Sequence, residues 1–308
     1  NAAINPSAAE ICDGVDNDHD GATDESCVDL DECALGTDDC GAHATCVNFV
    51  GGFRCECEAG TLDIAGDGSE CVGFVKVATH WDTTCGIGDN NALYCWGYNY
   101  HGQVGDGSSG VGFDRASPTP IGSATDWLDV SASSQDSCGV GAGKLYCWGA
   151  QTSPAPGQVG SDSDWASVSV GTTHRCGVKA GALYCWGSNG SGELGDGTHD
   201  PQVSPIQVEG ASNWTGVSAG HGFTCGLRGG SLLCWGSNSY GTLGDGSHTH
   251  RSTPGQVGSA TDWTRVAAGT SHTCGIRSGQ LFCWGFNGAG ELGDGTTSES
   301  TSPIRGLQ

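Results

Sequence analysis

Short stretches in which apolar and polar residues alternate, separated by glycine-rich turns, fill residues 73–308, and no helical period runs through this part of the sequence. An alternation of period two places successive side chains on opposite faces and predicts half-buried β-strands. Near the end of the chain it predicts four strands, near Pro254–Val257, Trp263–Ala268, His272–Ile276 and Gln280–Trp284. This part of the chain is therefore predicted to be all-β.

The strand pattern occurs five times. The segment Cys-Trp-Gly recurs at intervals of 52, 38, 49 and 49 residues, and a Cys-Gly pair precedes each copy. A G-x-x-G-D-G loop follows most copies, and the third unit is shorter because this loop is absent before it. Four-stranded units repeated at about this length are typical of the blades of a β-propeller. The sequence predicts a propeller of five four-stranded blades.

The cysteine spacing supports hairpins within each unit. Cys274 and Cys283 lie symmetrically about Ser278-Gly279, and counting outward from a two-residue turn places them on a non-hydrogen-bonded pair. The Cα atoms of such a pair are about 4.5 Å apart, which suits a disulfide. We therefore expect one hairpin disulfide in every blade. The five pairs are Cys85–Cys95, Cys138–Cys147, Cys176–Cys185, Cys225–Cys234 and Cys274–Cys283.

The two ends of the repeat region predict a closed ring. Pro205, Pro254 and Pro303 each lie 20 residues after the Cys of a Cys-Trp-Gly segment, whereas the first unit begins at Phe74 without a preceding strand of this kind. We expect residues 303–308 to form a strand that completes the first blade, which would leave no open sheet edge. The same strand could instead complete the ring of a neighbouring copy.

Composition narrows the functional classes. The chain has 308 residues, 18 Cys and a formal net charge of −24, which argues against nucleic-acid and anionic-membrane partners. No stretch approaches the roughly 20 apolar residues of a membrane span. An even number of cysteines predicts disulfides and a secreted, extracellular or cell-surface location. The chain has no Met and no signal peptide, so we expect a mature exported protein.

Charge and cysteine spacing both change near Gly73. Residues 1–72 contain 17 acidic residues and one basic residue, Arg54, whereas the cysteines become strictly paired only after Cys71. We predict an N-terminal tail with an acidic loop over 1–28, a disulfide-rich module over 29–72 and the propeller over 73–308.

The repeats resemble those of the regulator-of-chromosome-condensation family. The resemblance rests on His272–Gly275, Leu281–Asn287 and Gly290–Gly295 and covers residues 73–308. It implies a propeller, usually of seven blades in this family, whereas five are predicted here. The family includes a nuclear exchange factor that contacts chromatin, a role not expected for an acidic, exported chain. It also includes secreted inhibitor propellers that bind a protein with one face.

Residues 29–72 resemble a calcium-binding EGF-like module. The stretch Cys46–Cys57 matches the pattern C-x-[DN]-x4-[FY]-x-C-x-C, and Asp29-Leu30-Asp31-Glu32 precedes the first cysteine. Calcium prefers six to eight oxygen ligands. The resemblance implies side-chain ligands Asp29, Glu32 and Asn48 and carbonyl ligands Leu30, Phe49 and Gly52. It also selects the disulfides Cys33–Cys46, Cys40–Cys55 and Cys57–Cys71 from the 15 pairings that six cysteines allow.

A second acidic loop lies at residues 10–27. Asp16, Asp18, Asp20 and Asp24 occupy positions 1, 3, 5 and 9 of an EF-hand-type loop, with Gly21 at position 6. The loop resembles the Asp-rich metal-binding motif of bacterial surface proteins, with His19 in place of a cysteine. We expect calcium here and a disulfide between Cys12 and Cys27. The alternative is a solvated acidic linker.

No catalytic motif stands out. The sequence has no Ser-His-Asp order, H-E-x-x-H or P-loop, and His174 and His272 occupy a repeated position that is typical of an architectural role. We predict a non-enzymatic, calcium-stabilised structural or adhesive protein of a cell surface or extracellular assembly. Its partners would be other proteins or copies of itself, joined through terminal segments into a filament or layer. The alternative is a secreted binding or inhibitor propeller.

Overall fold

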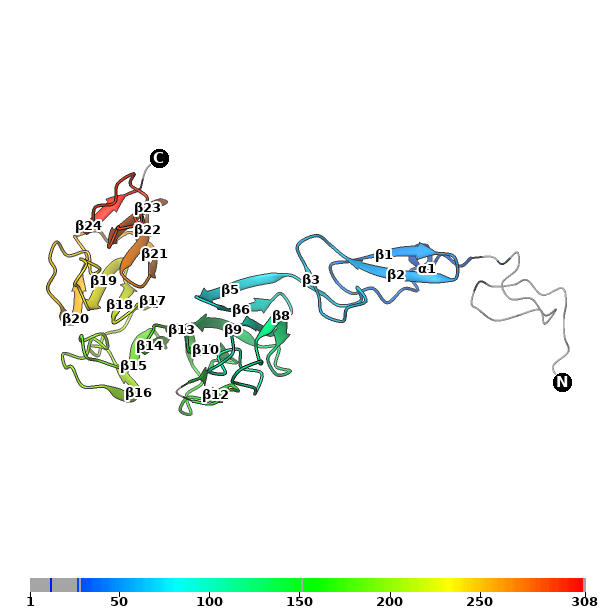
Figure 1. The fold of residues 1–308 in the computed structure, drawn as a ribbon, viewed down its shortest axis with the longest axis horizontal. Coiled ribbons are helices and arrows are strands. Elements are labelled where there is room, and N and C mark those ends of the chain that lie inside the picture. The colour runs from blue at the N-terminus through cyan, green and yellow to red at the C-terminus, as the bar shows by residue number, and fades with distance from the viewer. Residues whose placement is uncertain (1–11, 13–26, 28, 151, 307–308) are drawn as a thin grey trace. The chain divides into compact units, whose positions relative to one another are not determined.

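The structure is a computed structural model that describes residues 12, 27, 29–150 and 152–306 (Figure 1). The chain divides into two compact units. The first extends to Val75 and includes Gly88–Asn90, and the second contains Lys76–Ile87 and the chain from Asn91 onward. No helix among the described residues has the length and hydropathy of a membrane span.

The first unit is built on a short hairpin and three disulfides. Its described helix is α1 (Glu32–Leu35), and its strands are β1 (Ala44–Phe49), β2 (Gly52–Cys57), β3 (Leu62–Asp63) and β4 (Cys71–Val72). β1 pairs with β2 and β3 with β4, both antiparallel. The disulfides join Cys33 to Cys46, Cys40 to Cys55 and Cys57 to Cys71, which is the pairing that the EGF resemblance implies.

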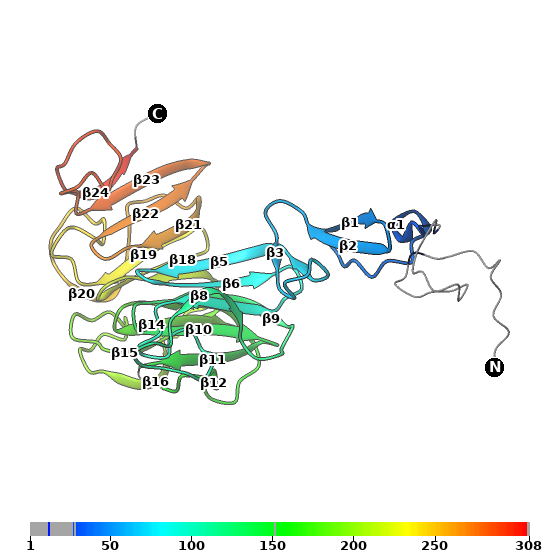
Figure 2. The ribbon, with the colours of Figure 1, turned by 45° about the vertical axis from the view of Figure 1, so that its right-hand side comes forward.

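The second part of the chain is an all-β, five-bladed propeller, as predicted (Figure 2). Each blade is one four-stranded sheet. The first contains β5 (Phe74–His80), β6 (Thr83–Gly88), β7 (Leu93–Gly97) and β8 (Arg115–Pro120). The second contains β9 (Trp127–Ala132), β10 (Asp136–Gly141), β11 (Lys144–Gly149) and β12 (Gly157–Gln158). The third contains β13 (Trp165–Val170), β14 (His174–Lys179), β15 (Ala182–Gly187) and β16 (Gln202–Gln207). The fourth contains β17 (Trp214–Ala219), β18 (Phe223–Arg228), β19 (Ser231–Gly236) and β20 (Arg251–Gln256). The fifth contains β21 (Trp263–Ala268), β22 (His272–Arg277), β23 (Gln280–Gly285) and β24 (Ser300–Arg305).

A hairpin disulfide crosses the middle of every blade. Cys138 pairs directly with Cys147 across β10 and β11, and the other four pairs have the same register. In all five the Cα atoms are 4.1 Å apart, close to the value expected of a non-hydrogen-bonded pair. The turn residues Ala142 and Gly143 both have positive φ, at 48° and 73°, as a type I′ turn requires. The prediction of disulfides in the blades is confirmed.

The expectation that the C-terminal strand completes the first blade is wrong. β24 pairs with β23, with Cys283 opposite Ile304, and completes the fifth blade. The first blade has its own fourth strand, β8, which pairs with β7. The strand that carries Pro254 likewise pairs backward, with β19. The reason is that the loop after each Cys-Trp-Gly segment folds back on its own sheet, so the Pro-containing strand ends a blade rather than beginning one.

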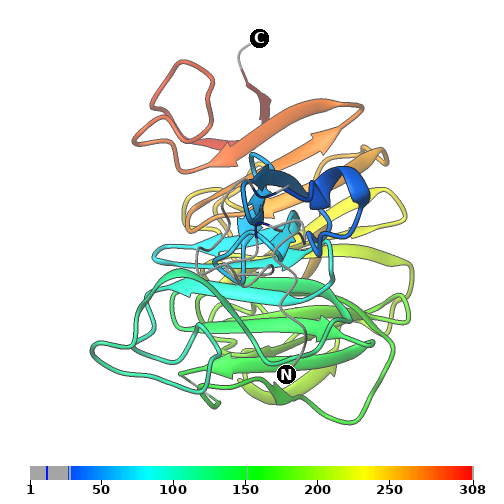
Figure 3. The ribbon, with the colours of Figure 1, turned by 90° about the vertical axis from the view of Figure 1, so that its right-hand side faces the viewer.

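The core lies between successive blades. Cys85, Leu93 and Cys95 on the hairpin of the first blade pack against Trp127 and Trp148 of the second. Equivalent clusters join the second blade to the third, the third to the fourth and the fourth to the fifth. Each blade therefore covers the hairpin of the blade before it. The fifth blade, orange to red in Figure 3, is the last of this series.

Candidate functional site

Helix-capping residues at both ends of α1 fix the local structure at the start of the EGF-like module. Asp31 is the N-cap of α1, and its Oδ1 accepts a hydrogen bond from the Ala34 amide at 2.9 Å. Gly36 ends the helix in the left-handed conformation, with φ of 64°. Glu32 is thereby held as the first helical residue, three positions after Asp29.

The β1–β2 hairpin brings Asn48 to Asp29. The Asn48 Nδ2 donates to Asp29 Oδ2 at 2.8 Å, and the Gly51 amide donates to Asp29 Oδ1 at 2.9 Å. Since the amide nitrogen of Asn48 bonds the carboxylate, its oxygen is left for another partner. Phe49 and Gly52 face each other at the end of the hairpin.

Two buried oxygens of this group have no hydrogen-bond partner among the described residues. They are Glu32 Oε2 and Asn48 Oδ1. A buried polar oxygen without a partner is costly, and a bound cation removes that cost. Asp29, Glu32 and Asn48, which we call the oxygen cluster, offer only oxygen ligands, the donor set that a hard divalent cation requires. The residues present therefore fit a metal ion of the calcium class, and the carbonyls of Leu30, Phe49 and Gly52 lie on the same segments.

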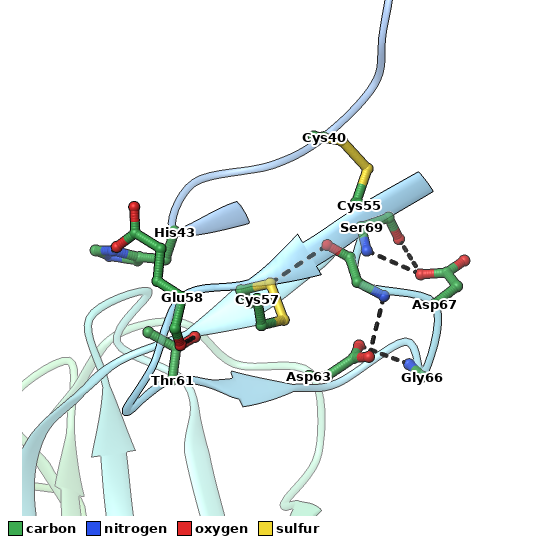
Figure 4. Close-up of a disulfide and its surroundings, with 12 residues drawn as sticks. Cys40, His43, Cys55, Cys57, Glu58, Thr61, Asp63, Gly66, Asp67 and Ser69 are labelled. Atoms are coloured by element: carbon green, nitrogen blue, oxygen red, sulfur yellow. Dashed lines mark hydrogen bonds and ion pairs between the residues drawn. A yellow bond between two sulfur atoms is a disulfide. The ribbon is translucent and has the colours of Figure 1, made fainter. Parts of the chain in front are cut away.

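The carboxylates at the far end of the module serve a different purpose (Figure 4). Asp63 accepts hydrogen bonds from the amides of Gly66 and Gly68, at 2.7 and 3.0 Å. Asp67 accepts from the Ser69 hydroxyl and amide, and these bonds hold the pKa of Asp67 below its usual value. These two acids close the loop beside the Cys57–Cys71 disulfide rather than form a ligand set.

The acidic N-terminal loop cannot be placed in the same way. Asp16, Asp18, Asp20 and Asp24 lie outside the described residues. The flanking Cys12 and Cys27 are joined by a disulfide.

The G-x-x-G-D-G loops of the propeller are closed by a buried asparagine. In the fourth blade, Asn238 Nδ2 donates to Asp245 Oδ1, Ser247 O and Thr249 O, and Asn238 Oδ1 accepts from the Leu243 amide at 3.0 Å. The same arrangement occurs at Asn99, Asn189 and Asn287. Hydrogen bonds from the loop lower the pKa of the loop aspartates despite partial burial, as at Asp245. The repeated aspartates are therefore turn-forming residues.

Three of these loops also hold a tryptophan of the next blade, in what we call the Trp slot. The indole Nε1 of Trp148 donates to the carbonyl of Gln103, that of Trp235 to Glu193 and that of Trp284 to Thr242, at 2.8 to 2.9 Å. All three indoles are buried. The Trp of Cys-Trp-Gly is thus interblade core, and sequence reasoning missed only its carbonyl partner.

His174 belongs to the same interface. Its Nε2 lies 2.7 Å from Thr224 Oγ1, and the Thr224 hydroxyl donates to the Glu193 carbonyl at 2.8 Å. Because the hydroxyl hydrogen is used there, the imidazole Nε2–H is the donor to Thr224 and Nδ1 carries no proton. Burial, with the positive charges of Arg175 and His221 nearby, lowers the pKa of His174 to about 3. His174 is a neutral structural residue at neutral pH.

The inner strands border two cavities. One, of about 580 Å³, is lined by residues of all five blades, including Lys76, Asp129 and Arg265. The other, of about 270 Å³, lies at the C-terminal ends of the inner strands and is bordered by Trp81, which is 79% exposed. An exposed Trp at such a mouth is the kind of side chain that anchors protein contacts. No repeat signal pointed to Trp81, because the equivalent residues of the other blades are Ser134, Thr172, His221 and Thr270, none of them aromatic like Trp.

Comparison with known families agrees with this architecture. Two models of the regulator of chromosome condensation (RCC1) repeat match the propeller, one at residues 90–140, 180–227 and 229–276 and the other at 74–103. The propeller is built from RCC1 repeats. The calcium-binding EGF domain model matches residues 29–71, and a metal-binding motif of the MopE type matches residues 1–25.

The curated relatives that resemble this chain match a short part of it. Nidogen-2 of Mus musculus is 49% identical over 47 residues, which are 15% of this chain and 3% of that protein. The sushi, von Willebrand factor type A, EGF and pentraxin domain-containing protein 1 of Rattus norvegicus is 45% identical over 51 residues, 17% of this chain and 1% of that protein. The chain thus spans only a few per cent of these relatives. Together with the nine disulfides, the EGF module marks this chain as a secreted or surface protein.

Solved structures share the propeller fold. Human WBSCR16 superposes with a TM-score of 0.69 at 20% identity, covering 82% of this chain and 71% of that one. A chain of the complex of Kap60 with yeast RCC1 (Prp20) gives 0.53 at 15% identity, covering 83% and 78%. At these identities the likeness concerns the fold alone.

Proposed function

We propose that this protein is a non-enzymatic, calcium-stabilised structural or adhesive protein of a cell surface or extracellular assembly, and that copies of it associate with one another. The observation that carries the proposal is that two oxygens, Glu32 Oε2 and Asn48 Oδ1, are buried without a hydrogen-bond partner among the described residues, while the Asn48 amide is hydrogen-bonded to the Asp29 carboxylate. Calcium bound there would tie the entry segment of the module to its central hairpin. A module stiffened in this way leads into a disulfide-bonded propeller, a combination suited to bearing load.

Several features support a role without catalysis. The loop aspartates use their oxygens to close turns, and His174 is a neutral residue in a blade interface. Such repeated groups are accounted for by the architecture of the blades. Where a titratable residue serves every blade in the same way, its role is to hold the repeat together.

Trypsin offers a selective test, because Arg54 is the one basic residue in residues 1–72. Arg54 lies on β2, the strand that pairs with the Asn48 strand. Calcium at about 100 times its Kd would add about 2.7 kcal/mol to the stability of the module, which slows cleavage through local opening about 100-fold. Cleavage after Arg54 is read on reducing gels, in calcium and in EDTA.

The matched variants are Glu32→Gln and Glu56→Gln. Glu56 is an exposed residue of β2 that pairs with Arg54. We expect calcium to protect Arg54 in the wild type and in Glu56→Gln, but much less in Glu32→Gln. Equal protection of Arg54 in both variants would show that the metal is not held by the oxygen cluster. If calcium protects Arg54 in neither the wild type nor the variants, calcium binding is removed from the proposal.

A binding propeller is the second candidate, and exposed Trp81 beside the cavity at the ends of the inner strands favours it. Yeast RCC1 (Prp20) is bound to Kap60 in one solved structure, and another concerns its binding to Gsp1p and histones; those partners belong to that protein. For this chain the test is whether Trp81→Ala removes a stoichiometric protein partner from native secretions while leaving the melting temperature unchanged.

A further inference from the structure

The second blade lacks the loop that forms the Trp slot in other blades. The third blade has this loop as Gly-Glu-Leu-Gly-Asp-Gly at 192–197, and the identical hexapeptide recurs at 290–295. After Gly149, by contrast, the chain reaches β12 at Gly157 without the motif. Trp186 on β15 of the third blade therefore has no Trp slot to enter. It is only 4% exposed, and no described group accepts a hydrogen bond from its Nε1.

A filled slot supplies three contacts to the next blade. Between the third and fourth blades, the Glu193 carbonyl accepts from Trp235 Nε1, and Leu194 is fully buried in the same cluster. The Gly197 amide donates to the carbonyl of Ser252 on β20 at 2.8 Å. One glycine-rich turn thus offers a carbonyl, an aliphatic side chain and an amide together. The same three contacts recur through Gln103, Val104 and Gly107 of the first blade and Thr242, Leu243 and Gly246 of the fourth.

The surface that would receive such a turn is present between the second and third blades. Val203, at the position of Ser252, is 98% exposed, and no described amide of the second blade donates to its carbonyl. Val159 is only partly buried, whereas the equivalent Val208 and Val257 are 0% and 1% exposed. Trp186, Val159 and Val203 border a cavity of about 400 Å³, which we call the Trp186 pocket.

Arg175 takes the place of a hydroxyl in this pocket. In three other interfaces a Ser or Thr opposite the indole donates to the same loop carbonyl; these residues are Ser137, Thr224 and Thr273. Arg175 lies opposite Trp186 and lines the pocket, and its Nη2 pairs with Asp136 Oδ2 at 2.8 Å. Both charged side chains are buried, so their charges balance within the interface. A further buried charge would be costly, and the pocket therefore favours neutral amide groups over an anion.

We propose that the Trp186 pocket binds a glycine-rich peptide turn of another protein. A backbone carbonyl of the turn accepts from Trp186 Nε1, an aliphatic side chain covers Val159, and an amide donates to the Val203 carbonyl. The three filled slots show that a turn of this chemistry fits this receiving surface. Glycine is required where the turn passes the indole, because a Cβ on Gly195 would lie 2.6 Å from Trp235 Nε1. The buried indole N–H, without an acceptor in the chain, gains one on binding.

The probe is a cyclic peptide that copies residues 188–200, the loop of the third blade. It keeps Asn189, whose Oδ1 accepts from the Leu194 amide and so holds the turn in shape. Binding to the whole protein is measured by the anisotropy of the labelled peptide. Its location is read from the indole N–H signal of Trp186 in the nuclear magnetic resonance spectrum, which is assigned by its loss in Trp186→Phe. The control peptide carries Leu194→Asp and should not bind.

Three protein variants separate the pocket from the rest of the surface. Val203→Asp changes a fully solvated side chain at the rim, so the fold is kept and peptide binding should be lost. Val111→Asp, at a residue 88% exposed in the first blade, is the matched control and should bind like the wild type. Trp186→Phe keeps an aromatic ring and removes the donor, so affinity should fall about fivefold, as expected for one hydrogen bond.

Other outcomes would overturn the inference. These are a wild type that does not bind the peptide at millimolar concentration, an unchanged affinity in Val203→Asp, or binding that leaves the Trp186 signal in place. A Trp186 signal that shifts with protein concentration in the absence of peptide would place a second copy in the pocket and exclude a different protein. The pocket requires neither calcium nor association of copies, so its test and the Arg54 protection test can succeed or fail separately.

Discussion

The most specific consequence of the blade stacking concerns two glycines in identical loops. Gly195 and Gly293 have φ of +74° and +63°, so alanine at either position incurs the same left-handed backbone cost of about 1–2 kcal/mol. A Cβ at Gly195, however, would lie 2.6 Å from Trp235 Nε1 and 2.9 Å from its Cε2. The indole would have to move, losing its bond to the Glu193 carbonyl, worth about 1 kcal/mol, and straining a closely packed interface by about 1–3 kcal/mol.

Gly195→Ala is therefore expected to destabilise the propeller by about 2–4 kcal/mol more than Gly293→Ala. Urea unfolding followed by tryptophan fluorescence measures the difference, at a protein concentration where the chain is monomeric. Gly244→Ala, whose Cβ would lie 2.6 Å from Trp284 Nε1, should behave like Gly195→Ala. Equal losses of stability in Gly195→Ala and Gly293→Ala would refute the reasoning, because they would mean that the last slot is as occupied as the third.

Three further predictions concern the interior of the propeller. The pKa of His174 is 6.5 in the unfolded chain and about 3 in the folded chain. The free energy of unfolding is therefore highest above pH 6.5 and falls as the pH drops, by about 2 kcal/mol at pH 5. His174→Phe, which copies Phe223 of the fourth blade, should abolish this pH dependence in a series of urea midpoints. Replacing Cys225 and Cys234 together by alanine should lower the free energy of unfolding by about 3 kcal/mol in calorimetry, since a short loop is no longer closed in the unfolded chain. Asn238→Leu should cost at least about 2 kcal/mol in urea unfolding, because the Leu243 amide loses its acceptor in a buried loop, and a smaller loss would mean that water replaces the amide.

Local features of the fold were predictable from the sequence. The disulfide between Cys138 and Cys147 follows from strand alternation and from a turn, Ala142-Gly143, that needs positive φ; all of this information lies within about ten residues. The calcium-type module was predictable because its cysteines and Asn48 have a characteristic spacing. Its ligand set remains a prediction that the orphaned oxygens support.

The assignment of the fourth strand was not predictable in the same way. The strand at Pro254 lies between two possible neighbours, β19 and β21, and alternation is equally compatible with either. The choice depends on the loop that Asn238 closes, which returns the chain to β19, and the alternation of apolar and polar residues does not report these hydrogen bonds. The difference between Gly195 and Gly293 is invisible for a related reason, since the two hexapeptides are identical and only the neighbouring atoms in the folded chain distinguish them, with Trp235 beside Gly195 and no described atom within 4 Å of a Cβ at Gly293.

Calcium titration of the intact protein by isothermal calorimetry tests the central claim most directly. The wild type and Glu56→Gln should bind with the same stoichiometry, and Glu32→Gln should lose one site, whatever the acidic loop at residues 10–27 contributes to the remaining heat. Identical isotherms for Glu32→Gln and the wild type would contradict the account, because Glu32 would then not be a ligand and its buried oxygen would need another explanation.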